Sequence, residues 1–200
     1  WSSDVCSPRS GYLKTILPNE PVNSSANPVL SIRKEGNTPA WGAVYEQYFQ
    51  EIDKVKGQKG VLSVEKKLFV ETNNGTNRQI RPVTPEQPLR IGDKVIVRLT
   101  IRTDREMNYV FLKDLRAGCF EPADQLSSPE SRDGIWYYRS PKDVSENFFI
   151  NRLPEGTFVL EYPVYVSRSG EYAGGISTIQ CMYAPEFVSH TAGESLRIMP

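Results

Sequence analysis

Hydrophobic and polar residues alternate with a period of two along several stretches of the chain. Apolar side chains occupy every second position from Phe158 to Val166 and again from Val95 to Ile101. Because successive side chains of a β-strand point to opposite faces of a sheet, each stretch predicts a strand with one buried face. Further strands are predicted at 29–33, 40–49, 64–70, 107–113, 135–139, 147–151 and 176–183.

The spacing of these strands predicts the fold class. They recur at intervals of roughly 8 to 12 residues with turn residues between them, which is typical of two antiparallel sheets packed face to face. No stretch has the i, i+3, i+4, i+7 spacing of an amphipathic helix over three turns. We therefore predict an all-β protein with an immunoglobulin-like antiparallel β-sandwich.

The stretch from residue 153 to residue 187 is predicted to form the hairpin that closes this sandwich. Strands at 158–166 and 176–183 would pair across a turn at 167–175, which contains three glycines. Pro163 lies inside the first strand and cannot donate a hydrogen bond to a sheet, so we expect a sheet edge or a bulge at that point.

Composition divides the chain into an N-terminal segment and one domain. Residues 1–27 are rich in Ser, Pro and Asn and are expected to be a truncated element and a loop that lead into a domain at 28–200. Residues 72–90 contain three prolines and no apolar period, which predicts a long connection. The start at Trp1, without a signal peptide, predicts that the segment comes from a larger protein.

Charge and cysteine content narrow the function classes. The formal net charge is zero, from 24 basic and 24 acidic residues, which argues against nucleic acid as a partner. No stretch approaches the roughly 18 apolar residues that span a membrane, so we expect no membrane contact. Of the three cysteines, Cys119 and Cys181 form the candidate disulfide, which would stabilise the fold by about 4 kcal/mol; the favoured alternative is that all three, including Cys6, are buried thiols.

The sequence shows no catalytic or metal-binding constellation. His190 is the only histidine, so a multi-histidine metal site is excluded and a catalytic triad would have to use this residue. We expect no catalytic residue, no metal and no cofactor. A small hydrolase that uses His190 beside Ser189 or a nearby carboxylate remains an alternative, which predicts loss of activity in His190→Ala.

Exposed aromatic residues are the candidates for an interface. Trp136 and Tyr138 share one face of a predicted strand and Tyr137 takes the other. We favour packing in the core or against another domain; the alternative is a carbohydrate-binding module, in which an exposed coplanar strip of rings stacks on sugars. The other interface candidates are Tyr183, Glu186 and Phe187, because Pro185 breaks a strand there and could turn Phe187 toward a neighbouring domain, unless a bulge tucks it inward.

Six stretches carry a resemblance to a known family. They are GNTPAWGAVY (36–45), GDKV (92–95), DREMNYV (104–110), FEP (120–122), NFF (147–149) and GISTIQCMYAPEF (175–187). In order and spacing this set resembles the C-terminal macroglobulin domain of bacterial α2-macroglobulin-like proteins, of the Bacteroidetes type. The family pattern has a small residue where this chain has Cys119, so a bridge from it to Cys181 would be peculiar to this chain.

The resemblance implies the setting and the activity of a parent protein. It implies a macroglobulin-type sandwich in a large protein of the cell envelope, periplasmic or associated with the outer membrane, that is secreted or anchored by a lipid. Such a protein is an endopeptidase inhibitor in bacterial defence, which traps proteases after cleavage of a bait segment, in many members through a thioester. The thioester signature Cys-x-Glu-Gln is absent here. The implied partners are other domains of the parent chain, proteases and a peptidoglycan-synthesising enzyme.

Overall fold

A computed structural model gives the arrangement of the strands. It describes residues 14, 33, 36–37, 39, 41–42, 49–74, 77–84 and 86–200. Contacts divide the chain into two units, Trp1–Gln47 and Tyr48–Pro200, and every strand of the described residues lies in the second unit. The expected strands at 29–33 and 40–49 and the expected domain start at residue 28 fall outside the described residues, apart from isolated positions.

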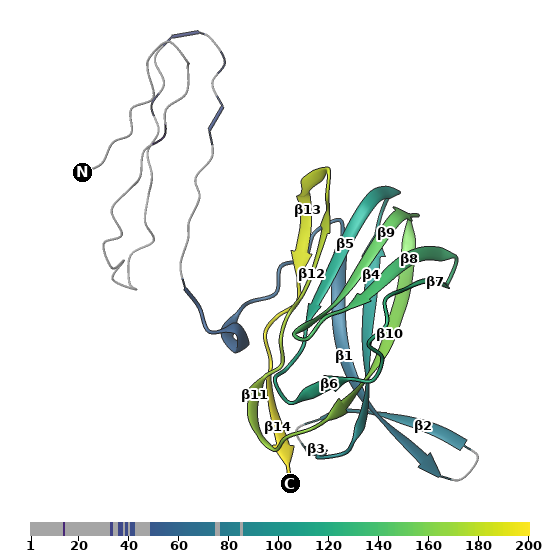
Figure 1. The fold of residues 1–200 in the computed structure, drawn as a ribbon. Coiled ribbons are helices and arrows are strands. Elements are labelled where there is room, and N and C mark those ends of the chain that lie inside the picture. Colours follow the sequence, from purple (N-terminus) through teal and green to yellow (C-terminus); the bar gives the residue numbers. More distant parts are fainter. Residues whose placement is uncertain are drawn as a thin grey trace. The chain divides into compact units, whose positions relative to one another are not determined.

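The second unit consists of one short helix and a succession of strands (Figure 1). The helix is the 3-10 turn η1 (Ile52–Lys54). The strands are β1 (Ser63–Asn74), β2 (Asn77–Pro82), β3 (Leu89–Arg90), β4 (Lys94–Thr103), β5 (Met107–Leu115), β6 (Phe120–Pro122), β7 (Ser128–Arg132), β8 (Ile135–Pro141), β9 (Ser145–Leu153), β10 (Gly156–Val166), β11 (Gly170–Ala173), β12 (Ser177–Cys181), β13 (Ala184–His190) and β14 (Ser195–Met199).

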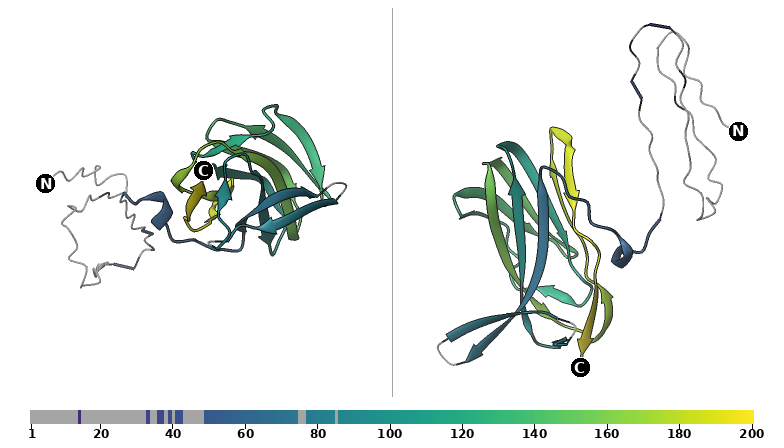
Figure 2. Two further views of the ribbon diagram at one scale, coloured as in Figure 1. Left: turned by 90° about the horizontal axis from the view of Figure 1, so that it is seen from below. Right: turned by 180° about the vertical axis from the view of Figure 1, so that it is seen from behind.

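These strands form two sheets that pack face to face and a smaller sheet at one end (Figures 1 and 2). The five-stranded sheet has the order β2-β1-β4-β10-β6 and the six-stranded sheet has the order β13-β12-β5-β9-β8-β7. The small sheet is β11-β14-β3, in which β3 and β14 make the one parallel pair among the described strands. The all-β, immunoglobulin-like antiparallel sandwich is thus confirmed.

Alternating side chains of both sheets meet in the core. From the five-stranded sheet come the odd-numbered positions 95–101 of β4 and the even-numbered positions 158–166 of β10, all buried. The six-stranded sheet supplies the facing side chains, including Leu112, Phe148, Ile150 and Ile179, each at most 1 % exposed. Burial of a large apolar side chain stabilises a fold by about 1.5–3 kcal/mol, so β4, β5, β9, β10 and β12 account for much of the hydrophobic stabilisation.

The predicted closing hairpin is wrong, although its strands exist. β10 pairs with β4 and β6, whereas β12 pairs with β5 and β13. The chain between them crosses from one sheet to the other and forms β11 on the way. Periodicity identifies a half-buried strand but does not name its neighbour, because any strand with the same buried face satisfies the pattern.

The expectation of a sheet edge at Pro163 is confirmed. The Pro163 carbonyl oxygen accepts a hydrogen bond from the Ala123 N–H, on the β6 side of β10. The backbone nitrogen of a strand residue points to the same side as its carbonyl, and β6 pairs only with residues 164–166 of β10. The ring nitrogen therefore faces the side of β10 where the ladder ends.

Two segments without alternating apolar residues contain strands. Residues 72–90, expected to be a long connection, contain the end of β1, all of β2 and β3, and β1 with β2 forms an arm that extends beyond the sandwich (Figure 2). Residues 121–133 contain β7, which turns into β8 through Asp133 and Gly134, both with positive φ (52° and 83°). The described residues of β2 and β7 are largely solvent-exposed, so these two strands show no apolar alternation.

Candidate functional site

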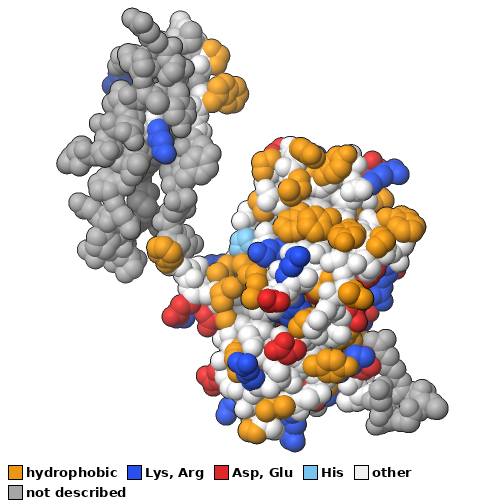
Figure 3. Space-filling model, in the orientation of Figure 1, with side chains coloured by type: hydrophobic (Ala, Val, Ile, Leu, Met, Phe, Trp, Pro, Cys, Tyr) orange, Lys and Arg blue, Asp and Glu red, His pale blue; other side chains and the backbone are white. Residues whose placement is uncertain are grey.

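The outer side of the six-stranded sheet carries a set of exposed aromatic residues. Phe111 of β5 lies directly opposite Phe149 of β9, which lies opposite Tyr138 of β8. Trp136 precedes Tyr138 by two residues on the same side of β8. Tyr109 of β5 continues the set, and its ring contacts the ring of Tyr183 in the β12–β13 turn. We call this set, with Met182, the outer aromatic face; Figure 3 shows hydrophobic side chains gathered across this part of the molecule.

Solvent reaches most of this face. The exposed fraction is 81 % for Tyr183 and 70 % for Trp136, and the remaining members except Phe111 are between 45 % and 56 % exposed. Tyr137 and Phe148 lie on the opposite side of β8 and β9. Both are buried, and their rings pack edge to face. Alternation along β8 and β9 therefore puts one aromatic set in the core and the other in solvent.

The rings of the face pack against one another. The Phe111 and Phe149 rings are stacked, with centroids 5.0 Å apart and planes 27° apart. The Tyr109 and Tyr183 rings meet at 82° with centroids 5.1 Å apart. These are favourable aromatic pair geometries.

Tyr109 holds an unusual backbone conformation within this face. Its φ is +56°, in the left-handed region that a bulky residue rarely occupies. Such a conformation costs roughly 1–2 kcal/mol for a residue with a Cβ. Its carbonyl oxygen accepts a hydrogen bond from the Met182 N–H at 2.9 Å, which ties it to the β12–β13 turn.

A cavity of about 390 Å³ adjoins the face at the same end of the sandwich. Its lining is mainly apolar and includes Met107, Tyr109, Cys181, Tyr183 and Phe187. Phe187 is partly buried against the core and the Arg105 guanidinium lies 5.7 Å from its ring centroid. The bulge that the sequence left open does occur, as a register shift between Gln180 and Cys181.

The interface candidates of the sequence analysis have separate outcomes. Trp136, Tyr138 and Tyr183 are exposed and belong to the face, and Glu186 is exposed on β13. Phe187 is instead tucked inward. Tyr109, Phe111 and Phe149 were missed as members; the alternation of β5 and β9 placed them opposite the core, but only the strand order shows that they adjoin Tyr138.

A buried ionic cluster joins the two sheets from the inside. Asp114 of β5 has no exposed surface, and its Oδ1 accepts hydrogen bonds from Lys66 Nζ at 2.8 Å and from Ser177 Oγ at 2.7 Å. The Tyr162 hydroxyl donates to Oδ2. Burial and the charge of Asp114 raise the pKa of Tyr162 well above its ordinary value, so the phenol stays a donor.

A second cluster lies between β8, β9 and the loop after β5. The fully buried Glu146 accepts from Arg139 Nε at 2.7 Å and pairs with Arg116 at 3.5 Å. Tyr137 donates from its hydroxyl to Glu130 at 3.0 Å, and burial together with that hydrogen bond raises its pKa to about 12. Each charge in these clusters has a partner of opposite sign, which is the condition under which buried charges persist.

His190 lies in a cleft with two glutamates, apart from the Ser189 side chain. His190 lines a cleft of about 580 Å³ that also contains Glu65 and Glu194. Its Nδ1 lies 3.1 Å from the Thr191 carbonyl oxygen. Ser189 points into the sandwich and is fully buried, because neighbouring strand residues face opposite sides. Among the described residues no three His, Cys, Asp or Glu side chains gather to hold a metal, and no helix is long and apolar enough to cross a membrane.

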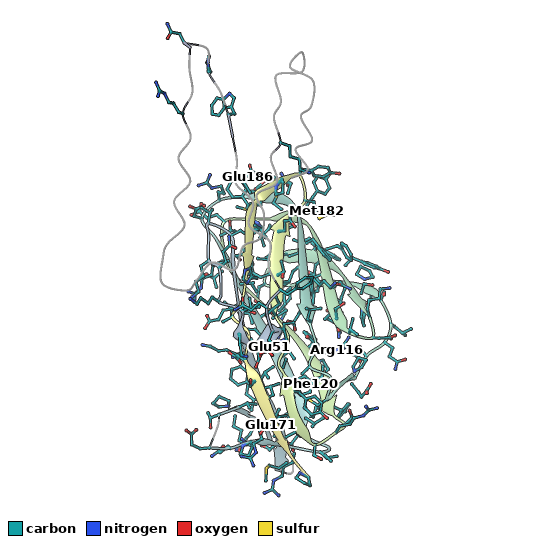
Figure 4. All side chains as sticks on the ribbon, turned by 90° about the vertical axis from the view of Figure 1, so that its left-hand side faces the viewer. Glu51, Arg116, Phe120, Glu171, Met182 and Glu186 are labelled. Carbon is teal, nitrogen blue, oxygen red and sulfur yellow. The ribbon has the colours of Figure 1, made fainter. Side chains whose placement is uncertain are left out.

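The candidate disulfide is not formed. Cys119 and Cys181 are both buried free thiols. Arg116 and Phe120 flank Cys119 in the sequence, and Met182 follows Cys181. Figure 4 places Phe120 and Met182 toward opposite ends of the sandwich. Burial raises the pKa of the Cys119 thiol to about 11, and the Cys181 thiol donates to the Asn108 carbonyl at 3.2 Å. Cys6 falls outside the described residues.

The two packed antiparallel sheets define an immunoglobulin-like β-sandwich domain with an exposed aromatic face, and comparison with known proteins identifies its family. The family described as bacterial alpha-2-macroglobulin MG10 domain matches residues 62–186. This chain therefore belongs to that family. The match takes in most strands of both large sheets, from β1 to β13, and the whole outer aromatic face.

Solved structures show the same fold. Salmonella alpha-2-macroglobulin reacted with methylamine is similar with a TM-score of 0.56 and 21 % identity, over 72 % of this chain and 10 % of that chain. Escherichia coli alpha-2-macroglobulin from domain MG7 to the C-terminus gives 0.56 and 17 %, over 72 % of this chain and 24 % of that one.

One curated relative also matches this chain. Circularly permutated Ras protein 2 of Dictyostelium discoideum is 28 % identical over 109 residues, which are 54 % of this chain and 3 % of that protein. The chain thus spans only a small part of each relative's length.

Proposed function

We propose that this chain is a non-catalytic domain at the C-terminal end of a bacterial alpha-2-macroglobulin-like protease inhibitor. The match of residues 62–186 to the MG10 domain family carries this proposal. Among the structurally similar proteins, E. coli alpha-2-macroglobulin has been activated by porcine elastase and by trypsin. The parent protein would trap such proteases in the cell envelope, as a secreted or lipid-anchored protein.

The proposed role of the domain itself is packing against other domains of its parent. Its charged core groups are paired internally, and its exposed aromatic face offers contact area rather than acid, base or nucleophile. A peptidoglycan-synthesising enzyme of the envelope is a further candidate partner. Protein surfaces that exclude water around aromatic residues are typical of interface centres.

Carbohydrate binding is a second candidate, favoured by the exposure of Trp136 and Tyr138. The printed ring pairs of the face involve Tyr109, Tyr183, Phe111 and Phe149, so Trp136 and Tyr138 would have to supply the stacking surface. Binding of soluble peptidoglycan fragments by the chain, lost in Trp136→Ala with an unchanged thermal midpoint, would favour this candidate over the first.

The proposal is tested on the parent protein encoded by the complete reading frame. We expect a frame of well over a thousand codons, from which the purified protein is cleaved by elastase at one exposed segment. After cleavage, elastase should keep its activity toward a small chromogenic peptide and lose most activity toward casein. Equal inhibition of both substrates, or no inhibition, contradicts a trap. A short frame that encodes only a secreted sandwich also contradicts it.

A further inference from the structure

We propose that the cleft of about 580 Å³ beside β1 is a strand-acceptor groove. Its occupant is an extended polypeptide segment with alternating apolar and polar side chains, which pairs antiparallel with the free backbone edge of β1. This inference goes beyond the proposed function, because it concerns a surface apart from the outer aromatic face and requires no protease.

β1 has one edge that is only partly covered. β4 pairs with residues 63–71 along one edge, whereas β2 pairs along the other edge with residues 69–74 only. The covered part ends at the Leu68 carbonyl oxygen, which accepts a hydrogen bond from the Val83 N–H at 2.9 Å. Because the N–H and C=O groups of alternate residues in a strand point to the same edge, those of Val64 and Lys66 point the same way. No other strand of the described residues pairs with them.

This free edge forms one wall of the cleft. Residues 64–68 lie along that wall, and Gly174 with the loop at 190–194 forms the opposite wall. Figure 2 shows β1 beside the yellow C-terminal strands, where the two large sheets meet. The opposite wall is joined within itself, since the Gly174 N–H donates to the Glu194 carbonyl oxygen at 2.7 Å. β1 therefore supplies the backbone groups with which an added strand would pair.

The cleft has the dimensions of a short strand. At roughly 3.3 Å per residue, the distance from residue 64 to residue 68 is about 13 Å, and the volume lies in the range of roughly 300–1,000 Å³ that is typical of ligand sites. An inward-pointing charge is one device that protects a sheet edge. Lys66 points inward, but its Nζ is already bound by Asp114 and by the carbonyl oxygens of Leu115 and Gly174.

The neighbouring side chains define the sequence of the occupant. Side chains of an added strand alternate in the same way as those of β1. The inward ones would lie beside Val64, Leu68 and Leu196, which are apolar and at least partly buried, so they should be apolar or small. The outward ones would flank Glu65 and Lys67, which pair at 3.1 Å. A lysine opposite Glu65 and a glutamate opposite Lys67 complement this pair.

The remaining lining residues disfavour other classes of ligand. Once the pairs of Lys66 and Lys67 are set aside, Lys59 and Glu194 contribute one charge of each sign, which gives no basis for binding a strongly charged molecule. None of the described lining residues is Phe, Tyr or Trp, so a sugar finds no ring of these types on which to stack. Addition of a strand to a free sheet edge is a common mode of peptide recognition and fits each of these features.

Titration of this chain with the peptide acetyl-TVEAKVT-amide tests the inference. In antiparallel pairing its glutamate lies opposite Lys67, its alanine opposite Lys66 and its lysine opposite Glu65. We expect calorimetry to give a Kd below about 1 mM. In hydrogen exchange followed by NMR, saturating peptide should slow the Lys66 amide at least about tenfold. Absence of binding at about 1 mM overturns the inference.

The edge strand β7 of the other large sheet is the control for location. Its amides should exchange at the same rate with and without the peptide. Equal slowing along β7 means that the peptide adds to any open edge, which overturns the assignment to the cleft. Slow exchange of Lys66 in a dimer of the chain without peptide assigns the groove to a second copy and also overturns it.

Two altered peptides test the mode of pairing. N-methylation of the alanine keeps every side chain but removes the N–H that donates to the Lys66 carbonyl oxygen, so affinity should fall at least about tenfold. Equal affinity overturns main-chain pairing. The peptide acetyl-TVKAEVT-amide places like charges opposite Glu65 and Lys67 and should bind about twofold to fivefold more weakly. Equal or tighter binding of this peptide overturns the antiparallel occupant.

A matched pair of protein variants tests the site itself. Ala192 is exposed on the wall opposite β1, so Ala192→Trp should obstruct the groove and weaken binding at least about tenfold. Val144→Trp adds the same ring at an exposed position in the turn between β8 and β9 and should leave the affinity unchanged. Both variants should keep the thermal midpoint of the unsubstituted chain. Unchanged binding in Ala192→Trp, or an equal loss in both variants, overturns the site.

The peptide experiment is independent of the elastase assay. It uses this chain alone, so a failed titration rejects the groove and leaves protease trapping by the parent untouched. A parent that does not trap elastase rejects the proposed function, whereas peptide binding at β1 would still stand.

Discussion

Replacing Asp114 by asparagine should destabilise the sandwich strongly, because one carboxylate holds three donors from three other strands. Lys66 of β1, Tyr162 of β10 and Ser177 of β12 all donate to it. Asparagine keeps the volume but removes the charge and turns an acceptor into a donor. Breaking a buried ion pair from one side costs roughly 3–5 kcal/mol.

The lower end of that range applies here. After the substitution Lys66 Nζ keeps the carbonyl oxygens of Leu115 at 3.0 Å and of Gly174 at 3.3 Å. We therefore expect Asp114→Asn to lower the free energy of unfolding by about 3 kcal/mol. At roughly 2–4 °C per kcal/mol for a chain of this size, the thermal midpoint should fall by about 6–12 °C.

Urea unfolding measures this change, followed by circular dichroism and by the fluorescence of Trp136, the one tryptophan of residues 48–200. Lys67→Met is the control, because its pair with Glu65 is exposed on both sides and should be worth less than about 1 kcal/mol. The combined variant of Asp114→Asn and Lys66→Met should be more stable than additivity predicts, by about 2 kcal/mol. A loss below 1 kcal/mol, or additivity within about 0.5 kcal/mol, refutes the reasoning.

Three further predictions concern single positions. In Gly175→Ala the new Cβ would lie 2.2 Å from the Leu115 carbonyl oxygen, at a φ of +72°. The thermal midpoint should therefore fall far more than in the control Gly92→Ala, where φ is +88° but no atom lies within 4 Å of the new Cβ and the cost is about 1 kcal/mol. Equal shifts of the two midpoints would rule out the clash. Tyr137, with its pKa raised to about 12, stabilises the fold fully below about pH 10 and less as the pH rises toward 12, so an ultraviolet titration should lose one late-ionising phenol in Tyr137→Phe. Burial raises the pKa of Glu161, but the hydrogen bonds and charges of its two arginine partners outweigh burial and lower the pKa below its ordinary value of 4.5. The stabilisation of the fold by Glu161 is therefore present above that pH and is lost as the pH falls further. Glu161→Gln should show a smaller drop in urea midpoint between pH 7 and pH 3 than the unsubstituted chain, and an unchanged drop would contradict this.

Turn residues indicated one hairpin that the alternation of apolar residues did not. Asp133-Gly134 is the dipeptide that favours a two-residue hairpin turn, and it does join β7 to β8. β2 and β7 remained hidden because neither buries a continuous face, so neither leaves a period-two pattern. The sequence likewise could not separate an inward from an outward Phe187. This residue lies in the bulged part of β13, between Ala184, which pairs with Cys181, and Val188, which pairs with Gln180, and a bulge re-aims the side chains within it.

The sequence by itself determined the fold class, the strands with one buried face and the family resemblance. These follow from local patterns: alternation along β4 and β10, turn residues between strands, and motifs at a fixed order. It also determined that the second aromatic set of β8 would face away from Tyr137.

Only the tertiary structure decided which strands are neighbours, because pairing depends on contacts between residues far apart in the chain and not on the period within each strand. That decision separated β10 from β12, kept Cys119 away from Cys181, and brought Tyr138, Phe149 and Phe111 into one row. The buried acceptor at Asp114 has the same origin, since its three donors become neighbours only when both sheets are assembled.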